Sequence, residues 1–279
     1  MFHDLFMSRQ RGFDIIRLMM KKIYIYPNLT EKRYIEKVRK AISALEEKGY
    51  KCILDSGDGI LLYDDDYVQN ETIADCDMIV SLGGDGTFLR GCQLALDNDM
   101  PICGINCGNL GFLCACQLKD IDDLDIDALE LKELSLLQFE YKGKIYNALN
   151  EVVVGKDYFG GTVELEYSSG NHHGKFRGDG LIVCTATGST AYNISAGGTV
   201  FKEEDGLIGI TPICSHTRGV NAVTVDQSQS VKICLVDKKY TASIFADGIA
   251  IGKLNEINVS LSDRKVKVLT NKQNDRHLA

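Results

Sequence analysis

Residues 78–87, Met-Ile-Val-Ser-Leu-Gly-Gly-Asp-Gly-Thr, decide the fold, because an apolar run passes directly into a glycine-rich loop. The run at 78–82 predicts a buried strand, and we expect a helix to begin near Phe88. In an open parallel sheet, a loop between a strand and a helix lies at the carboxyl edge of the strands, where ligands bind. The stretch therefore predicts an α/β domain with a ligand-binding loop.

The residues before this loop alternate between strand and helix patterns. A strand at 23–26 is followed by Asn28 and Glu31, whose spacing resembles a helix capping box, and then by a helix that Gly49 can end. The apolar residues of this helix fall on one face: Ile35, Val38, Ile42 and Leu45. Further strands are predicted at 50–54 and 101–105. Such alternation predicts parallel strands joined by helices.

The pattern changes after about Leu129, where strands follow one another closely. A turn is predicted at Lys142-Gly143, and strands are predicted at 136–141, 145–154, 163–167, 181–185, 207–210, 222–225, 231–236 and 241–245. Closely spaced strands favour an antiparallel sheet. The fold class we predict is an N-terminal open parallel, Rossmann-like α/β domain followed by a β-rich, sandwich-like domain.

Domain boundaries follow from these patterns. We expect the α/β domain at residues 20–125, the β-rich domain at 126–258, and a C-terminal segment at 259–279 that could return to the first domain. Residues 1–19 mix Phe, Arg, His and Asp without a pattern. We interpret them as a disordered or mis-started extension, since translation can begin at Met20.

Composition narrows the range of partners. The 279 residues carry a formal net charge of -8, whereas binding to nucleic acid or anionic lipid requires clustered Lys and Arg. No apolar run approaches the roughly 18 to 20 residues that span a bilayer. We therefore expect a cytoplasmic protein with neither a nucleic-acid nor a membrane partner. The 10 cysteines lie mostly in apolar runs, which indicates free buried thiols, and their one cluster lacks the paired spacing of a structural zinc site.

The glycine loop carries the clearest chemistry. We expect Gly83, Gly84 and Gly86 to adopt positive φ and to bring backbone N–H groups close to phosphate oxygens, ahead of a helix N-terminus that favours an anion. Asp85 among them is electrostatically costly, which indicates a further task, such as accepting a proton from a hydroxyl or helping to hold magnesium. As an isolated match, a simple tight turn is an equally good explanation. Neither the P-loop nor the GxGxxG pattern fits this loop.

Three later segments carry polar residues that suit a binding site. Residues 106–112, Asn-Cys-Gly-Asn-Leu-Gly-Phe, form a second glycine-spaced loop, and residues 176–198 are rich in Gly, Ser and Thr. Asn150 and Glu151 interrupt an apolar strand and suit hydrogen bonds to sugar hydroxyls and a base edge, while Tyr192 offers an aromatic face for a purine. An ordinary turn and a plain Ser/Thr loop are the alternatives for the two loop segments.

Taken together, these motifs resemble those of the bacterial-type NAD kinase family. The family's GGDGT at 83–87, its Asn-Glu pair at 150–151, its T-x-T-G-S-T-A-Y at 185–192 and its T-P-I-x-x-H at 211–216 occur here in order. The similarity runs from about Lys21 to the C-terminus. Ala186 and Ser215 stand where the family usually has proline. Neither departure removes a reacting group.

The resemblance implies an enzyme that phosphorylates the adenosine-ribose 2′-hydroxyl of NAD from ATP or polyphosphate to make NADP, with Asp85 as general base. It implies that the donor phosphates bind at Gly83, Gly84, Gly86 and Thr87, together with Mg²⁺ or another divalent metal. No direct protein ligand is assigned to the metal. It implies an NAD site formed by Asp85, Gly86, Phe112, Asn150, Glu151, Arg177, Asp179, Thr187, Thr190, Ala191, Tyr192, Ser195 and Asp247. It also implies a homodimer or homotetramer.

Several alternatives stay open on the sequence alone. The GGDGT loop also resembles that of diacylglycerol and sphingosine kinases, and a related loop occurs in phosphofructokinases, but this acidic chain offers no evident lipid-binding or sugar-phosphate-binding surface. A pyridine-nucleotide sensor would not need the base that Asp85 provides. The sequence does not decide the phosphoryl donor, the choice between NAD and NADH, feedback by NADPH, or whether His216 is structural or catalytic.

Overall fold

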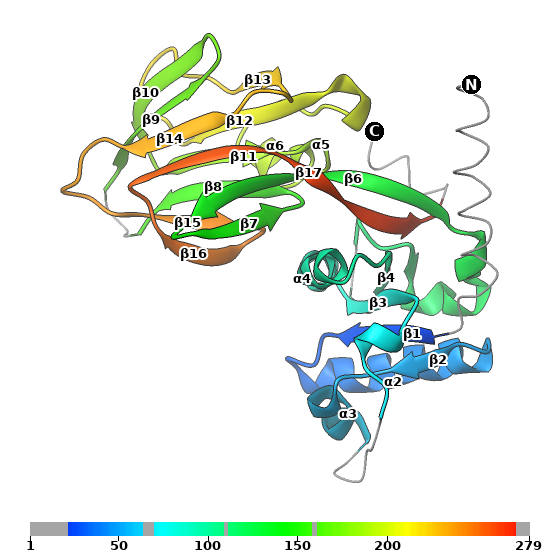
Figure 1. The fold of residues 1–279 in the computed structure, drawn as a ribbon. Helices are drawn as coiled ribbons and strands as arrows, with labels where there is room; N and C mark the ends of the chain where they lie inside the picture. Colours follow the sequence, from blue (N-terminus) through cyan, green and yellow to red (C-terminus); the bar gives the residue numbers. More distant parts are fainter. Residues whose placement is uncertain (1–21, 64–69, 109–110, 158–160, 272–279) are drawn as a thin grey trace, which may run out of the picture. The chain divides into compact units, whose positions relative to one another are not determined.

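The chain folds into two compact units (Figure 1). The structure, a computed structural model, describes residues 22–63, 70–108, 111–157 and 161–271, so the extension predicted at 1–19 lies outside the described residues. The first unit comprises the described residues up to Glu133 together with those from Val266 onward. The second unit comprises Leu134–Lys265.

The first unit is built on a parallel sheet, as predicted. Its strands run in the order β4-β3-β1-β2, and all neighbouring pairs are parallel. In chain order its main elements are β1 (Lys22–Pro27), α2 (Lys32–Glu47), β2 (Lys51–Ile53), α3 (Ser56–Tyr63), β3 (Met78–Gly83), α4 (Asp85–Asp97), β4 (Ile102–Asn106) and β5 (Cys116–Gln117). Short 3-10 turns lie at Ile73–Asp75, Leu118–Asp123 and Ile126–Ala128. The predicted open α/β domain is confirmed.

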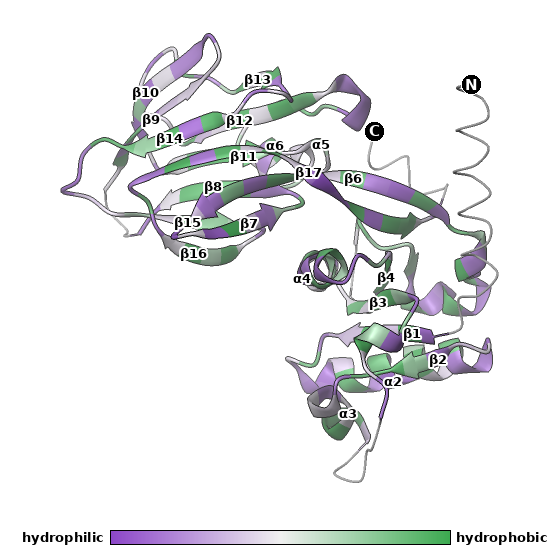
Figure 2. Ribbon diagram, viewed as in Figure 1, coloured by the Kyte–Doolittle hydropathy of each residue, from purple (hydrophilic) through white to green (hydrophobic). Residues whose placement is uncertain are grey.

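Helix α2 shows how the sequence pattern becomes packing. Figure 2 shows both hydrophobic and hydrophilic residues along this helix, and its buried face, which includes Val38 and Leu45, packs in one cluster with Ile23 and Ile25 of β1. Gly49, with φ of 90°, ends the helix as predicted. The predicted capping box is wrong, because Glu31 is the N-cap and makes no side-chain cap bond.

Asn28, the residue assigned to that capping box, makes a local turn instead. Its Oδ1 accepts hydrogen bonds from the backbone N–H of Thr30 at 3.2 Å and from the Thr30 hydroxyl at 2.7 Å. Asn commonly bonds the backbone two residues ahead of itself in this way. The bond occupies the oxygen that a cap would have used.

The second unit is a β-sandwich. Six antiparallel strands form one sheet in the order β13-β12-β11-β8-β15-β16, and β10, β9, β14 and β17 pair antiparallel in the other. The strands are β6 (Glu130–Tyr141), β7 (Lys144–Ala148), β8 (Glu151–Lys156), β9 (Val163–Ser169), β10 (His172–Gly178), β11 (Gly180–Cys184), β12 (Leu207–Ile213), β13 (Val223–Asp226), β14 (Val231–Leu235), β15 (Ala242–Ala246), β16 (Ile249–Lys253) and β17 (Glu256–Thr270). The predicted β-rich domain is confirmed.

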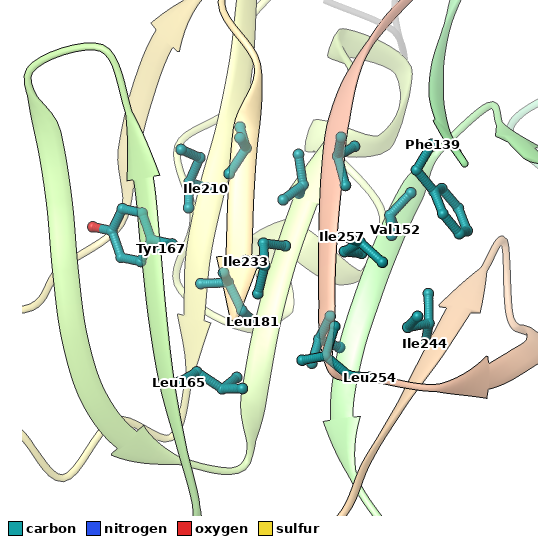
Figure 3. Close-up of a cluster of buried hydrophobic side chains, with 14 of the residues drawn as sticks. Phe139, Val152, Leu165, Tyr167, Leu181, Ile210, Ile233, Ile244, Leu254 and Ile257 are labelled. Atoms are coloured by element: carbon teal, nitrogen blue, oxygen red, sulfur yellow. The ribbon is translucent and has the colours of Figure 1, made fainter. Parts of the chain in front are cut away.

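One hydrophobic core joins the two sheets of this unit. Figure 3 shows Leu165 and Ile233 from one sheet beside Leu181 and Ile210 from the other, and all four side chains are fully buried. The strict alternation predicted for 163–167 places Val163, Leu165 and Tyr167 on this buried face. The core explains why the alternating pattern was a reliable signal.

Some predicted boundaries differ from the structure. The strand predicted at 145–154 is two strands, because the chain breaks at Leu149 and Asn150: β7 pairs with β6, whereas β8 pairs with β11 and β15. The turn at Lys142-Gly143 is confirmed, with φ of 53° and 77°. Strands β10, β16 and β17 were not predicted. The last residues of β17 pair in parallel with β4, as Val268 with Ile102 and Leu269 with Cys103.

Candidate functional site

The glycine loop of the first unit is tighter than expected. Helix α4 begins at Asp85, three residues before the predicted start, and Gly84 is its N-cap. None of Gly83, Gly84 and Gly86 has a positive φ, so the expected backbone conformation is wrong. Asp85 is therefore the first residue of a helix and lies where the helix dipole favours a negative charge.

The three glycines are needed for different reasons. A Cβ atom on Gly83 would lie 2.3 Å from Oγ1 of Thr87, a side chain only 3% exposed, so the fold itself excludes a side chain at Gly83. A Cβ atom on Gly84 would meet nothing within 4 Å, and one on Gly86 would meet only Nη1 of Arg90 at 3.9 Å. Packing does not explain Gly84 and Gly86. Their missing side chains leave the start of α4 open to a ligand.

The carboxylate of Asp85 is held by the loop that follows β4. Its Oδ2 accepts a hydrogen bond from the backbone N–H of Phe112 at 3.0 Å, and its Oδ1 accepts one from Leu113 at 3.2 Å. These bonds and the helix dipole stabilise the charge. These two hydrogen bonds offset part of the electrostatic cost that the sequence indicated. The loop passes close by, since a Cβ atom on Gly111 would lie 3.1 Å from Oδ1 of Asp85.

The residues of the loop that follows β4 differ in exposure. Asn106 is 1% exposed, and its Oδ1 accepts the backbone N–H of Gly108 at 2.8 Å. The Phe112 side chain is 51% exposed. Asn109 and Leu110 of the predicted motif lie outside the described residues. The structure thus brings Asp85, Asn106 and Phe112 together in the first unit.

In the second unit, Asp247 organises the backbone around the Asn-Glu pair. Asp247 and Gly248 form the turn between β15 and β16, with φ of 46° and 79°. The Asp247 carboxylate accepts three backbone N–H groups, from Leu149 at 2.7 Å, Asn150 at 2.8 Å and Glu151 at 3.2 Å. Burial raises the pKa of Asp247 and these bonds lower it, with burial the larger effect. Asp247 thus fixes the break between β7 and β8.

Asn150 and Glu151 present unpaired acceptors. Glu151 is 9% exposed. Burial, followed by the charge of Asp247, raises its pKa to about 7, and a hydrogen bond from the backbone N–H of Tyr192 lowers this pKa only in part. Oε2 of Glu151 and Oδ1 of Asn150 are buried and have no hydrogen-bond partner among the described residues. A buried polar atom without a partner costs about 1–3 kcal/mol. A ligand that donates hydrogen bonds would remove this cost.

The Ser/Thr-rich segment forms two short helical turns, α5 (Ala186–Ser189) and α6 (Tyr192–Ser195). Several of its hydroxyls bond within the protein: Thr185 donates to the carbonyl of Leu149 at 2.6 Å, and Ser189 donates to that of Phe201 at 3.1 Å. The Thr190 hydroxyl donates to the carbonyl of Thr187 at 3.3 Å. These hydroxyls hold the loop in place.

The same segment packs tightly against the Asn-Glu pair. A Cβ atom on Gly188 would lie 2.0 Å from the carbonyl oxygen of Asn150, so glycine is required at this contact. Thr187 is 8% exposed, whereas Tyr192 is 44% exposed and Ser195 is also exposed. The aromatic face predicted for a purine is therefore accessible at Tyr192.

Burial and nearby acidic groups act on the Tyr192 hydroxyl. Burial, followed by the charges of Cys214, Asp179 and Glu151, raises the pKa of the Tyr192 hydroxyl. Asp179 forms an ion pair of 2.6 Å with Lys156, a residue that sequence reasoning missed. Arg177 pairs instead with Glu164, at 3.3 Å. Tyr192 thus contacts Glu151 through its backbone N–H, and the charge of Asp179 also acts on its hydroxyl.

The remaining expectations concern metals, thiols and membranes. None of the 10 cysteines, all of which lie in the described residues, forms a disulfide. Among the described residues, no group of three or more His, Cys, Asp and Glu is arranged to hold a metal ion. No helix in the described part of the chain is long and apolar enough to cross a membrane. The backbone N–H of His216 donates to the carbonyl of Arg177 at 2.8 Å.

Comparison with known families covers most of the chain. The family model described as the ATP-NAD kinase N-terminal domain matches residues 14–129, and that of the ATP-NAD kinase C-terminal domain matches residues 149–271. The NAD kinase of Ruminiclostridium cellulolyticum is 33% identical over 243 residues, which are 82% of this chain and 84% of that protein. The NAD kinase of Clostridium beijerinckii is 33% identical over 72% of this chain and 76% of that protein.

Two solved structures share the fold. Yeast NADH kinase complexed with NADH has a TM-score of 0.77 at 20% identity, covering 92% of this chain and 85% of that one. An NAD kinase from Archaeoglobus fulgidus in complex with ATP has a TM-score of 0.72 at 23% identity, covering 92% of this chain and 96% of that one.

Proposed function

Because this chain belongs to the NAD kinase family and is therefore an enzyme that phosphorylates NAD, we propose that Asp85 is the base that activates the 2′-hydroxyl of its adenosine ribose. The observation that carries this role is the Asp85 carboxylate, held at the start of α4 by the backbone N–H groups of Phe112 and Leu113. A base must be oriented before the substrate arrives, and two hydrogen bonds provide that orientation.

The glycine loop supplies the donor side of the proposed reaction. Gly84 and Gly86 leave the first turn of α4 uncovered, so a phosphate can approach its backbone N–H groups and the positive end of the helix dipole. Thr87 is buried against Gly83, which favours a role for Thr87 in shaping the loop. We propose ATP as the donor, and polyphosphate stays an alternative.

The proposed chemical step is a single displacement. Asp85 takes the proton from the 2′-hydroxyl, and the oxygen forms a bond to the γ-phosphorus as the bond from that phosphorus to the β,γ-bridging oxygen breaks. ADP leaves, and the product is NADP. A positioned base in such a reaction contributes about 10²- to 10⁴-fold.

We propose that a divalent metal binds together with the donor phosphates. Mg²⁺ in kinase sites is held mainly by substrate phosphates and water, and it neutralises the charge that develops on the phosphoryl group. A Cβ atom on Gly84 would meet nothing within 4 Å, and Asp85 is the carboxylate beside this position. We assign no direct protein ligand to the metal.

The second unit supplies the acceptor-binding residues. We propose that the unpaired oxygens of Asn150 and Glu151 accept hydrogen bonds from NAD, because both are buried without a partner among the described residues. Tyr192 offers its exposed ring to the adenine, with Thr187, Thr190, Ala191 and Ser195 around it. We also propose Asp179 and Arg177 as NAD-binding residues, and Asp247 acts by holding the backbone of the Asn-Glu pair.

The decisive experiment incubates the purified protein with NAD, ATP and Mg²⁺ and follows NADP with an NADP-specific dehydrogenase. We expect NADP, and a 2′-phosphate signal in ³¹P NMR. Parallel reactions with polyphosphate, with NADH and with EDTA identify the donor, the acceptor and the metal requirement. No product from any pair of donor and acceptor would overturn the assignment, and binding of NAD without turnover would indicate a sensor. A homodimer or homotetramer in the cytoplasm stays a prediction.

A further inference from the structure

We propose that Lys156 is a positioning residue for the acceptor, acting through Asp179. Lys156 holds one carboxylate oxygen of Asp179 so that the other oxygen is offered to a hydrogen-bond donor of NAD. This inference rests on the proposed function, since it concerns the same acceptor site. Its effect would appear in acceptor binding and would leave the donor and the chemical step unchanged.

The sheet register places the two residues opposite each other. Strands β8 and β11 are antiparallel, and Gly155 pairs with Gly180, so the next pair outward is Lys156 and Asp179. The backbone N–H of Lys156 donates to the carbonyl of Asp179 at 2.9 Å. Opposite charges at facing positions of antiparallel strands attract each other. The ion pair therefore follows from the register of the two strands.

Glycines on both sides of Asp179 restrict its position. A Cβ atom on Gly180 would lie 2.2 Å from the carbonyl oxygen of Val154, and one on Gly178 would lie 2.7 Å from that of Ile213. The backbone N–H of Asp179 also donates to the carbonyl of Ile213 at 2.9 Å. The neighbouring strands thus approach closely on either side, and the Asp179 backbone is fixed.

The ion pair uses only one oxygen of Asp179. The Nζ of Lys156 lies 2.6 Å from Oδ1 of Asp179 and 3.0 Å from the carbonyl oxygen of Gly161. The Lys156 side chain is 22% exposed and that of Asp179 is 36% exposed, so the pair is less screened than an ordinary surface pair. Among the described residues, no hydrogen bond to Oδ2 of Asp179 is present. That oxygen is available to a ligand.

Asp179 and Glu151 lie at opposite ends of the β8–β11 pair, since Glu151 pairs with Cys184 and Gly155 pairs with Gly180. The charge of Asp179 acts on the hydroxyl of Tyr192, as does that of Glu151, which also receives the backbone N–H of Tyr192. The charges of both carboxylates therefore reach the hydroxyl of the exposed Tyr192 from the two ends of this strand pair. A carboxylate only accepts hydrogen bonds, and NAD offers amide, amine and hydroxyl donors. Lys156 limits the conformations of the Asp179 carboxylate and so lowers the entropy lost when NAD binds.

A purely structural role makes a different prediction. If the pair only joined β8 to β11, then Lys156→Met would lower thermal stability and leave the KM values unchanged. A positioning role predicts a rise in the KM for NAD alone. Lys156→Arg keeps the charge and the donors, so it should restore most of the binding.

The test measures kcat, the KM for NAD and the KM for ATP for wild type, Lys156→Met and Lys156→Arg, with NAD binding followed by calorimetry. For Lys156→Met we expect the KM and Kd for NAD to rise about tenfold, typical of a charged hydrogen-bond contact, with kcat and the KM for ATP within about twofold. Lys156→Arg should stay within about threefold of wild type. Lys232→Met, which removes an exposed pair with Glu256 in the same unit, is the control and should match wild type.

A double-mutant cycle separates action through Asp179 from an independent effect. Asp179→Asn should also raise the KM for NAD, and adding Lys156→Met to it should change that KM less than about twofold. An equal effect of Lys156→Met with and without Asp179 overturns the inference, and so does a joint change in kcat and both KM values. Absence of NADP from wild type would defeat the proposed function instead, and calorimetry with NAD would still test Lys156.

Discussion

Asp85 in the first unit and Glu151 in the second are both acidic side chains at the start of a regular element, but their surroundings differ. Asp85 begins a helix, is partly exposed, and has both oxygens bonded to backbone N–H groups. Glu151 begins a strand, is buried, and keeps one oxygen without a partner among the described residues. Asp85 thus has a hydrogen-bond donor for each oxygen, whereas burial penalises the charge of Glu151.

The difference separates two tasks. A base must be charged and oriented before the substrate arrives, which matches Asp85. A binding residue can keep an acceptor oxygen without a partner until the ligand donates a hydrogen bond to it, and this matches Glu151. A ligand that lacks the donor leaves the oxygen unpaired, so selection against a wrong ligand is stronger. Each of the following changes tests one side of this comparison.

The largest effect is expected for Asp85→Asn. The amide cannot take the proton from the hydroxyl. Its NH₂ group also faces a backbone N–H whose hydrogen bond the carboxylate accepted in the wild type. We expect turnover to fall by about 10³-fold, within the range for loss of a positioned base. Steady-state NADP formation measures it.

The matched control for Asp85→Asn is Asp97→Asn at the other end of α4, where the aspartate is exposed and its side chain accepts a hydrogen bond from Gln93 of the same helix. Its activity should equal that of wild type. Near-normal activity of Asp85→Asn would remove the base role from Asp85 and leave the family assignment unaffected.

The second effect concerns pH and Glu151. Its pKa is raised to about 7 in the folded protein from the ordinary value of 4.5, so between these values the folded state binds more protons than the unfolded state. Stability should therefore fall as pH rises through this window. The loss is about 3 kcal/mol by linkage and is complete above about pH 7.

Glu151→Gln removes this titration. Urea unfolding of both proteins from pH 5 to 8 should show wild type losing stability relative to the variant as pH rises. Parallel curves for the two proteins would mean that the Glu151 charge is not penalised, and the contrast with Asp85 would fail.

A third, intermediate effect is expected for Asp247→Asn. The amide retains one acceptor oxygen. Its NH₂ group cannot accept the hydrogen bonds that the second carboxylate oxygen accepted from backbone N–H groups. We expect a loss of about 2 kcal/mol in unfolding free energy, and a higher KM for NAD because Asn150 and Glu151 shift. Asp226→Asn is the control for denaturation and kinetics, because this aspartate lies at the end of β13 and its side chain accepts hydrogen bonds from the backbone N–H and the hydroxyl of Ser228. Equal effects of the two variants would contradict the role given to Asp247.

The sequence revealed what local patterns encode. The run at 78–82 and the alternation at 163–167 predicted β3 and β9, because burial on a fixed face leaves a periodic signal. The start of α4 was misplaced because Gly84, a weak cap signal, is its N-cap. Strand β10 was missed because its exposed positions carry His, Lys and Arg, without an apolar run.

Sequence patterns could not predict contacts between residues that are far apart in the chain. Asp247 bonds Leu149 across 98 positions, and Lys156 meets Asp179 only through the register of β8 and β11. The motifs named Asp247 and Asp179, but nothing local in the sequence identified the groups that hold them. Pairing across a sheet depends on the whole fold, so these roles required the structure.

The smallest effect is expected for Gly86→Ala, where fold and function should change in opposite directions. The added Cβ meets only Nη1 of Arg90 at 3.9 Å, and alanine favours a helix over glycine by up to about 1 kcal/mol. The variant should therefore melt at a slightly higher temperature. Its methyl group covers the open start of α4, so the KM for ATP should rise about tenfold while the KM for NAD stays unchanged.

Gly83→Ala is the contrasting variant for Gly86→Ala, because its Cβ would lie 2.3 Å from Thr87 and should destabilise the loop itself. Thermal melts and donor kinetics distinguish the two. A stabilised Gly86→Ala with an unchanged KM for ATP would mean that donor phosphates do not approach this surface. Asp85 would then be held by Phe112 and Leu113 at a helix start that serves only the fold.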